Sequence, residues 1–249
     1  MSAEIGMEAR HWLELAKRAA HRTPTFTRFL EPSAEREAVS MAGKAGVHAE
    51  LWGGFDDAER RICAYYAEEA PSRDEYPIER IGVTWNEKFA TAGHRDILGA
   101  VMGLGLERDG IGDVAMCREG ACVFAHTDVA EYILGNLESA GRAHVRCKRL
   151  DVLPEILPPE GDTVRVTVNA LRMDAIVAAG YRISRSEAQR LIDTGMVKRN
   201  HAEELRTDCR LEEGDLLSIR GFGRCKVQCV EGETKKGRLA VQLFQYGKK

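Results

Sequence analysis

The amino-acid sequence predicts an α+β protein in which helices and strands alternate through successive regions. Two segments rich in proline and charge, residues 70–77 and 151–162, divide the chain. Between them, the apolar spacing changes from strand to helical periodicity and back in a regular order. We therefore expect an N-terminal helical region with a β-hairpin at 1–75, a middle domain at 76–152, a linker with an entering strand at 153–168, and a small C-terminal domain at 169–249.

The composition is that of an ordinary globular chain, since 44% of its 249 residues are hydrophobic and 30% are charged. No stretch approaches the roughly 18 apolar residues of a membrane span, and the N-terminus lacks the basic and apolar regions of a signal peptide. We expect a cytoplasmic protein without a membrane span. Its seven cysteines are odd in number and scattered, which a disulfide framework would not produce.

The first region, residues 1 to about 44, has mainly helical periodicity. Two helices are expected there, at residues 8–22 and 31–46. Residues 47–55 and 60–68 then predict two short strands that are joined at a Gly-Gly bend. This hairpin is placed to extend the sheet of the domain that follows.

The middle region has the most informative order of elements. Strands are expected at residues 78–86, 111–117, 121–125 and 142–150, and helices at 94–105 and 127–141. Thr127 is the expected N-cap of the second helix. The resulting order, βαββαβ, is that of a ferredoxin-like, or RRM-like, fold.

Two short helices are expected at the start of the C-terminal region. Asn169 is the predicted cap of the first helix, which should end at Gly180. Ser184 and Glu187 form a capping box for the second helix, and Gly195 occupies its left-handed C-cap position. Each helix carries an apolar stripe, so the two helices should pack on each other and turn their polar side chains outward.

The charge of the chain is unevenly distributed. From Leu171 to Lys249 there are 16 lysines and arginines against 11 aspartates and glutamates, whereas the preceding residues hold 20 against 28. Charge alone supports a polyanion-binding surface and a solvated surface about equally. The turn Gly221-Phe222-Gly223 favours binding, because its glycines permit close approach of a ligand and Arg220 and Arg224 flank it. Together the helix pair and this turn should form one basic concave surface.

The same region resembles the S-four RNA-binding domain, which is named after the fourth protein of the small ribosomal subunit. The family pattern is an Arg-x-Asp helix, then Ser-Arg-x-x-Ala-x-x-Leu-Ile-x-x-Gly-x-Val, and later Gly-Asp and an Arg-Gly turn. The matching positions are Arg172, Asp174, Ser184, Arg185, Ala188, Leu191, Ile192, Gly195, Val197, Asn200, Gly214, Asp215, Arg220 and Gly221. The chain departs from the pattern at His201, where the family usually has glycine after Val-Asn.

Nearly the whole chain resembles the YlmH family of bacterial RNA-binding proteins. The resemblance rests on the stretches TRFLEPSAEREAV, GGFDDAERRICAYY, HRDILGAVMGLGLERDGIGDVAM and the strand beginning GRAHV, together with the C-terminal region. It implies no catalytic activity, association with the large ribosomal subunit, rescue of stalled translation by holding peptidyl-tRNA, and a link to cell division. The implied partners are structured RNA, either rRNA or tRNA, and the large ribosomal subunit. Apart from the resemblance, the acidic N-terminal part is expected either to set orientation or to meet a protein partner.

The residues expected to contact RNA are polar side chains of the C-terminal domain. They are Arg182, Ser184, Arg185, Gln189, Lys198, Asn200, Arg220, Arg224 and Lys226. A second contact is expected at His94 and Arg95 in the middle domain. Arg172 either binds RNA or pairs with Asp174, and Phe222 is expected to pack on its own hairpin rather than to stack on a base.

Catalytic, cofactor and metal motifs are not found in the sequence. His94-Arg95-Asp96 lacks the asparagine that a kinase catalytic loop requires five residues later, and Cys117, Cys122, Cys225 and Cys229 lack the paired spacing of a zinc site. We expect no cofactor and no metal, with these cysteines as small buried thiols. The rival hypotheses are an RNA-modifying enzyme and a cell-division factor that acts through a protein partner.

Overall fold

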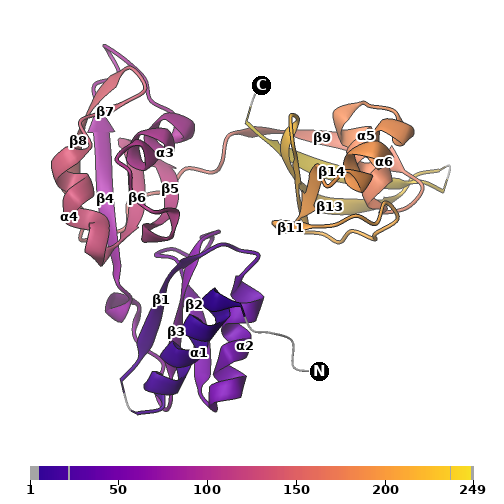
Figure 1. The fold of residues 1–249 in the computed structure, drawn as a ribbon. Coiled ribbons are helices and arrows are strands. Elements are labelled where there is room, and N and C mark those ends of the chain that lie inside the picture. The colour runs from indigo at the N-terminus through magenta and orange to yellow at the C-terminus, as the bar shows by residue number, and fades with distance from the viewer. Residues whose placement is uncertain (1–5, 22, 236, 248–249) are drawn as a thin grey trace. The chain divides into compact units, whose positions relative to one another are not determined.

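The structure is a computed structural model that describes residues 6–21, 23–235 and 237–247. It divides into two compact units, Met1–Pro158 and Pro159–Lys249. Helices are combined with antiparallel sheets, so the predicted mixture of helix and sheet is confirmed (Figure 1). No helix within the described residues is long and apolar enough to cross a membrane.

The first unit begins with two helices and a three-stranded sheet. Its elements are α1 Met7–Ala19, β1 Thr25–Leu30, α2 Glu35–Ala45, β2 His48–Trp52 and β3 Arg61–Tyr66. The central strand β3 pairs in antiparallel fashion with both β1 and β2. The helices bury Trp12 and Met41 against Tyr65 of β3, and this packing forms the core of the subdomain.

Two expectations for this region are wrong. Residues up to 44 are not all helical, because Thr25–Leu30 forms β1. Its sequence, TFTRFL, is rich in threonine and phenylalanine and so fits a pleated strand once β3 is present as a partner. The hairpin of β2 and β3 does not extend the middle sheet either, because β1 occupies the second edge of β3 and completes a separate sheet.

A second sheet follows in the same unit. Its elements are β4 Ile78–Trp85, α3 His94–Gly103, β5 Ile111–Cys117, β6 Gly120–His126, α4 Thr127–Asn136, β7 Ser139–Ala140 and β8 Ala143–Arg149, with short 3-10 helices η1 at Arg73–Glu75 and η2 at Arg108–Gly110. The strands are arranged in the order β5-β6-β4-β8-β7. Strand, helix, strand, strand, helix and strand thus follow one another as the periodicity predicts.

The second helix of this part is shorter than expected. The N-cap of α4 is His126 rather than Thr127, and its imidazole Nδ1 accepts a hydrogen bond from the amide of Asp128 at 3.2 Å. At the other end, Ser139 and Ala140 leave the helix and pair with the start of β8. Burial of Leu137 and Ala140 in the core draws the chain into this short strand.

Both faces of the β5 and β6 half of this sheet are buried. Along β6, Val123 packs beneath the helices, whereas the adjacent Cys122 and Phe124 belong to a different cluster with Phe29 and Ile62 of the three-stranded sheet. Gly112 makes this contact possible, because a Cβ there would lie 2.6 Å from the ring of Phe29. The two sheets of the first unit are therefore held together by interdigitated apolar side chains.

Arg60 reinforces this contact from a buried position. Only 5% of the residue is exposed, and its guanidinium donates to the carbonyl oxygens of Ile111 at 3.1 Å, Arg108 at 3.2 Å and Phe29 at 3.3 Å. It also pairs with Glu31. One cation thus satisfies backbone acceptors that the packing of the two sheets removes from water.

The second unit contains two helices on one face of a six-stranded sheet (Figure 1). Its elements are β9 Gly161–Val168, α5 Met173–Tyr181, α6 Arg185–Asp193, β10 Val197–Arg199, β11 Ala202–Glu203, β12 Leu216–Ile219, β13 Gly223–Glu233 and β14 Leu239–Tyr246. The strand order is β11-β10-β12-β13-β14-β9, so β9 closes the sheet by pairing with the last strand. Ile176 of α5 and Ile192 of α6 share one core with the sheet.

Both predicted boundaries of α5 are wrong. The helix begins at Met173 with Arg172 as its N-cap, and its first amides donate to the carbonyl oxygens of Cys209 and Thr207 rather than to Asn169. It ends at Tyr181, and Arg182, not Gly180, has the left-handed backbone of the C-cap. Glycine at 180 serves packing instead, because a Cβ there would lie 2.9 Å from Leu243 of β14.

Replacing Arg60 by methionine should lower the free energy of unfolding of the first unit by about 3 kcal/mol, because three buried carbonyl groups and Glu31 lose their partner. Urea unfolding followed by tryptophan fluorescence measures this, since all three tryptophans lie in that unit. The control is Arg118→Met, which removes an exposed pair with Glu155 and should cost less than about 1 kcal/mol. Equal losses in the two variants would contradict the role assigned to Arg60.

Candidate nucleic-acid interface

The most highly organised polar cluster of the second unit is centred on Asp174. Its carboxylate is fully buried in the first turn of α5. Arg172 donates to it through Nε and Nη2, both at 3.1 Å, and Arg185 of α6 donates through the same two atoms at 3.1 and 3.2 Å. Gln189, one turn further along α6, adds a bond of 3.1 Å. Asp174 thus joins the two helices and orients two arginines.

The electrostatics of the cluster follow from this geometry. Burial alone would raise the pKa of Asp174, but the hydrogen bonds from Arg172, Arg185 and Gln189 outweigh it and hold the pKa well below its usual range. The carboxylate therefore stays ionised, and with two arginines around it the cluster keeps a net positive charge. The arginine side chains are 38% and 54% exposed, and Nη1 of each is not used by Asp174.

The connection between the helices provides two more predicted site residues. Arg182 is exposed and has a left-handed backbone, with φ of 55°. Ser184 is the N-cap of α6 and accepts a hydrogen bond from the amide of Glu187 at 3.1 Å. The expected capping box is incomplete, because the Glu187 carboxylate binds Arg190 instead. Arg182, Ser184, Arg185 and Gln189 thus lie close together around the start of α6.

Asn200 has a structural function at the end of β10. Its amide nitrogen donates to Asp215 at 2.6 Å, and its side-chain oxygen accepts from the amide of Leu216 at 2.9 Å. Asp215, which is buried, also pairs with Arg199 at 2.7 Å. Asn200 and His201 both have positive φ, at 47° and 67°, and form the two-residue turn from β10 to β11.

The remaining cations of the expected surface lie on the sheet. Cys225 and Val227 of β13 point into the core beneath the helices, so the alternate residues Arg224 and Lys226 lie on the opposite face. Lys198 belongs to that face too, because the registers pair it with Ser218 and Ser218 with Arg224. The predicted residues therefore form two groups, one around the helices and one on the far face of the sheet, and not one concave surface.

The glycine-flanked turn has the predicted geometry. Gly221 and Gly223 have positive φ of 85° and 100° between β12 and β13. Phe222 packs edge-on against Tyr181, with ring centroids 5.6 Å apart. It is therefore packed rather than free to stack on a base, but the ring that it contacts belongs to helix α5 and not to its own hairpin, on which the sequence predicts it to pack. Arg220 is exposed at the start of this turn, and its backbone amide donates to Met196 just beyond α6.

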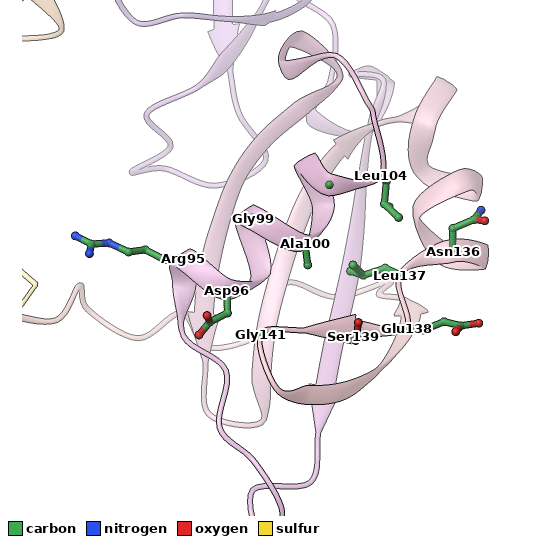
Figure 2. Close-up of a pocket in the computed structure, with 11 residues that line it drawn as sticks. Arg95, Asp96, Gly99, Ala100, Leu104, Asn136, Leu137, Glu138, Ser139 and Gly141 are labelled. Carbon is green, nitrogen blue, oxygen red and sulfur yellow. The ribbon is translucent and has the colours of Figure 1, made fainter.

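The second predicted contact lies at the start of α3 in the first unit. His94 and Arg95 are exposed there. Arg95 borders a shallow hollow of about 590 Å³ between α3 and residues 136–141, and Figure 2 shows its side chain directed away from the hollow. The carboxylate of Asp96 caps the start of its own helix, because it accepts a hydrogen bond from the backbone amide of Gly93 at 2.9 Å.

The cysteines do not form a metal site in the part of the chain that the structure describes, where no group of three or more potential ligands was found. Cys122 and Cys225 are buried as predicted, whereas Cys117 and Cys229 are partly exposed. Burial raises the pKa of Cys122 to about 12 and that of Cys225 to about 11. Both are therefore protonated thiols that fill space in the core.

Comparison with known proteins identifies first an RNA-binding domain within the chain and then the family to which the chain belongs. Residues 71–153 match the family model described as "Putative RNA-binding domain in YlmH". The chain is 34% identical over 217 residues to "Ribosome-associated protein quality control protein P2" of Bacillus subtilis (strain 168), and the match covers 86% of this chain and 84% of that protein. The chain therefore belongs to the YlmH family.

A solved structure is also similar to this chain. "Cell division protein ylmH from Streptococcus pneumoniae" matches with a TM-score of 0.45 and 22% sequence identity, over 60% of this chain and 95% of that one.

Stability of the second unit should depend on pH through Asp174. Because its folded pKa lies below the unfolded value of about 3.9, its contribution is complete above that value and is lost as the pH falls through the acid range. Asp174→Asn should therefore lower the melting temperature at pH 7 and differ less from the unaltered protein near pH 3. The control is Asp193→Asn at the exposed end of α6. A difference that does not depend on pH would contradict an ionised, hydrogen-bonded Asp174.

His201→Gly should stabilise the second unit by about 1 kcal/mol. A two-residue hairpin turn with positive φ at both positions favours Asn-Gly, and a side chain in the left-handed region is penalised by roughly 1–2 kcal/mol. Chemical denaturation of this variant beside His201→Ala separates the backbone effect from loss of the imidazole, because alanine retains the strain. Stabilisation by alanine as large as by glycine would show that the backbone is not responsible.

Proposed function

We propose that this protein binds structured RNA without catalysis, most strongly rRNA or tRNA on the large ribosomal subunit, and acts in ribosome-associated quality control. Residues 71–153 match a family model described as a putative RNA-binding domain, and the similar Bacillus subtilis protein is named for ribosome-associated quality control. The observation that carries the proposal is the buried Asp174 with its two half-exposed arginines.

This cluster is suited to binding a phosphate backbone. A guanidinium held through Nε and Nη2 has lost most of its rotamer freedom before RNA arrives, so little further entropy is lost on binding. Nη1 of Arg172 and of Arg185 remains to donate to an acceptor outside the protein, and the exposed Arg182 adds a third cation in the connection just before α6. Recognition would follow the shape and backbone of the RNA, because the base edges of A-form RNA are hidden.

The domain assignments belong to the same proposal. We assign an RRM-like fold to residues 76–152, supported by the strand order β5-β6-β4-β8, and an S-four-type domain to residues 169–249, supported by the α5 and α6 pair beside the sheet. Residues 1–75 would form the N-terminal region, and residues 153–168 would contain the linker and β9. In this arrangement the C-terminal domain anchors the protein on RNA.

Binding to purified large ribosomal subunits tests the proposal. The double variant Arg182→Gln, Arg185→Gln should reduce co-sedimentation at least tenfold. The slope of log K against log salt should also become shallower, by the amount expected for the loss of roughly two phosphate contacts. Arg190→Gln is the matched control, since Arg190 is an exposed cation of α6 that pairs with Glu187. Circular dichroism melting confirms that each variant folds.

Two results would overturn the assignment. Unchanged co-sedimentation of the double variant would remove Arg182 and Arg185 from the interface. An equal loss in Arg190→Gln would indicate that general charge, and not this cluster, determines binding. A further variant, Arg224→Gln with Lys226→Gln, measures separately what the far face of the sheet contributes.

A further inference from the structure

The five-stranded sheet β5-β6-β4-β8-β7 has one face covered by helices α3 and α4, and only half of its other face is accessible to a ligand. The face opposite α3 and α4 is covered over β5 and β6, where Phe124 is fully buried against Phe29 and Ile62. An aromatic residue at this place could not stack on a base without separating the two sheets. RNA that binds this domain therefore has to use another surface.

The uncovered half carries a row of cations along β8. Ala143 and Val145 point into the core, so the alternate residues His144, Arg146 and Lys148 lie exposed on the opposite face. Alternate residues of a strand are about 6.7 Å apart, a spacing comparable to that of successive phosphates in an extended nucleic-acid strand. Arg142 continues the row at the turn before β8.

These cations differ from their neighbour Arg149, which binds Glu79 and Glu131. Within the part of the chain that the structure describes, Arg142, Arg146 and Lys148 form no ion pair. Three positive charges without a carboxylate partner form an electrostatic footprint for a phosphate backbone.

An exposed aromatic residue stands at the Arg142 end of the row. Phe89, in the loop between β4 and α3, is 87% exposed. It borders a hollow of about 560 Å³ that is also lined by Thr91, Gly141 and Arg142. A single exposed apolar residue is common on protein surfaces, but here it lies beside an open hollow that Arg142 also lines.

We infer that a single-stranded segment of RNA binds along β8, with phosphates at Arg142, Arg146 and Lys148 and one base stacked on Phe89. The segment is single-stranded because only an unpaired base can present its face to an aromatic side chain. This inference rests on the proposed function and extends it, since it adds a second RNA contact on a different unit from Asp174.

Fluorescence anisotropy of the full chain with a labelled twelve-nucleotide RNA that lacks self-complementarity tests the inference. Phe89→Ala should weaken binding about tenfold, the loss expected for one base stack. Arg146→Gln with Lys148→Gln should lower the slope of log K against log salt by about 1.4, the value for two phosphates of a single strand. The matched control, Arg10→Gln with Lys17→Gln, alters two exposed cations of α1 and should retain wild-type affinity.

The outcomes separate this inference from the proposed function. If the unaltered protein binds large ribosomal subunits but not the oligonucleotide, the β8 surface is not a single-strand site and the Asp174 cluster is unaffected. If Phe89→Ala and the β8 variant bind the oligonucleotide as tightly as the unaltered protein, or if the α1 control loses as much affinity as they do, the inference is overturned. If neither RNA is bound, both proposals fail.

Discussion

The polar organisation of the second unit depends on one buried carboxylate. An aspartate without hydrogen-bond partners could not remain charged at the position of Asp174, because burial penalises the ionised form. Two guanidinium groups and the amide of Gln189 compensate for the lost water and link α5 to α6. The same bonds fix side chains that would otherwise sample many rotamers. The contacts that the core requires are thus the ones that orient the arginines of the proposed interface, which explains why an acidic residue lies among basic ones.

The sequence predicts the elements of this protein better than it predicts their partners. Periodicity locates both helices and the main strands of the middle domain, but it cannot tell that Thr25–Leu30 pairs with β3, because a short run of threonine and aromatic residues acquires a partner only in three dimensions. The boundaries of α5 show the same limit. Its first amides are satisfied by carbonyl oxygens of Cys209 and Thr207, more than thirty residues further along the chain, and not by the nearby Asn169. Local capping rules have no access to such contacts.

For the candidate site, the sequence predicts which residue types are present, but it only partly predicts where their side chains lie in the fold. The Arg-x-Asp pattern contains the central carboxylate, yet only the geometry shows that Asp174 orients both arginines. Arg224 and Lys226 are basic and near the predicted turn, but the alternation of β13 places them opposite the helices. The row on β8 was readable in principle, since RAHVRCKR alternates polar and apolar residues. Its meaning depends on which half of the sheet is covered, which no local pattern reveals.

The contact between the two sheets of the first unit then restricts where RNA can bind. Gly54 and Gly112 leave room for the rings of Phe124 and Phe29, and the guanidinium of Arg60 satisfies the carbonyl groups at the seam. Because of these contacts, the β5 and β6 half of the sheet is not available to RNA. Separating the two sheets would expose apolar side chains and leave the buried guanidinium of Arg60 without partners. The other half, along β8, stays exposed and is the surface on which we infer RNA binding. In the two proposals, a surface with cations on alternate residues and an exposed aromatic at one end suits a flexible polyanion, whereas the Asp174 cluster suits a rigid one.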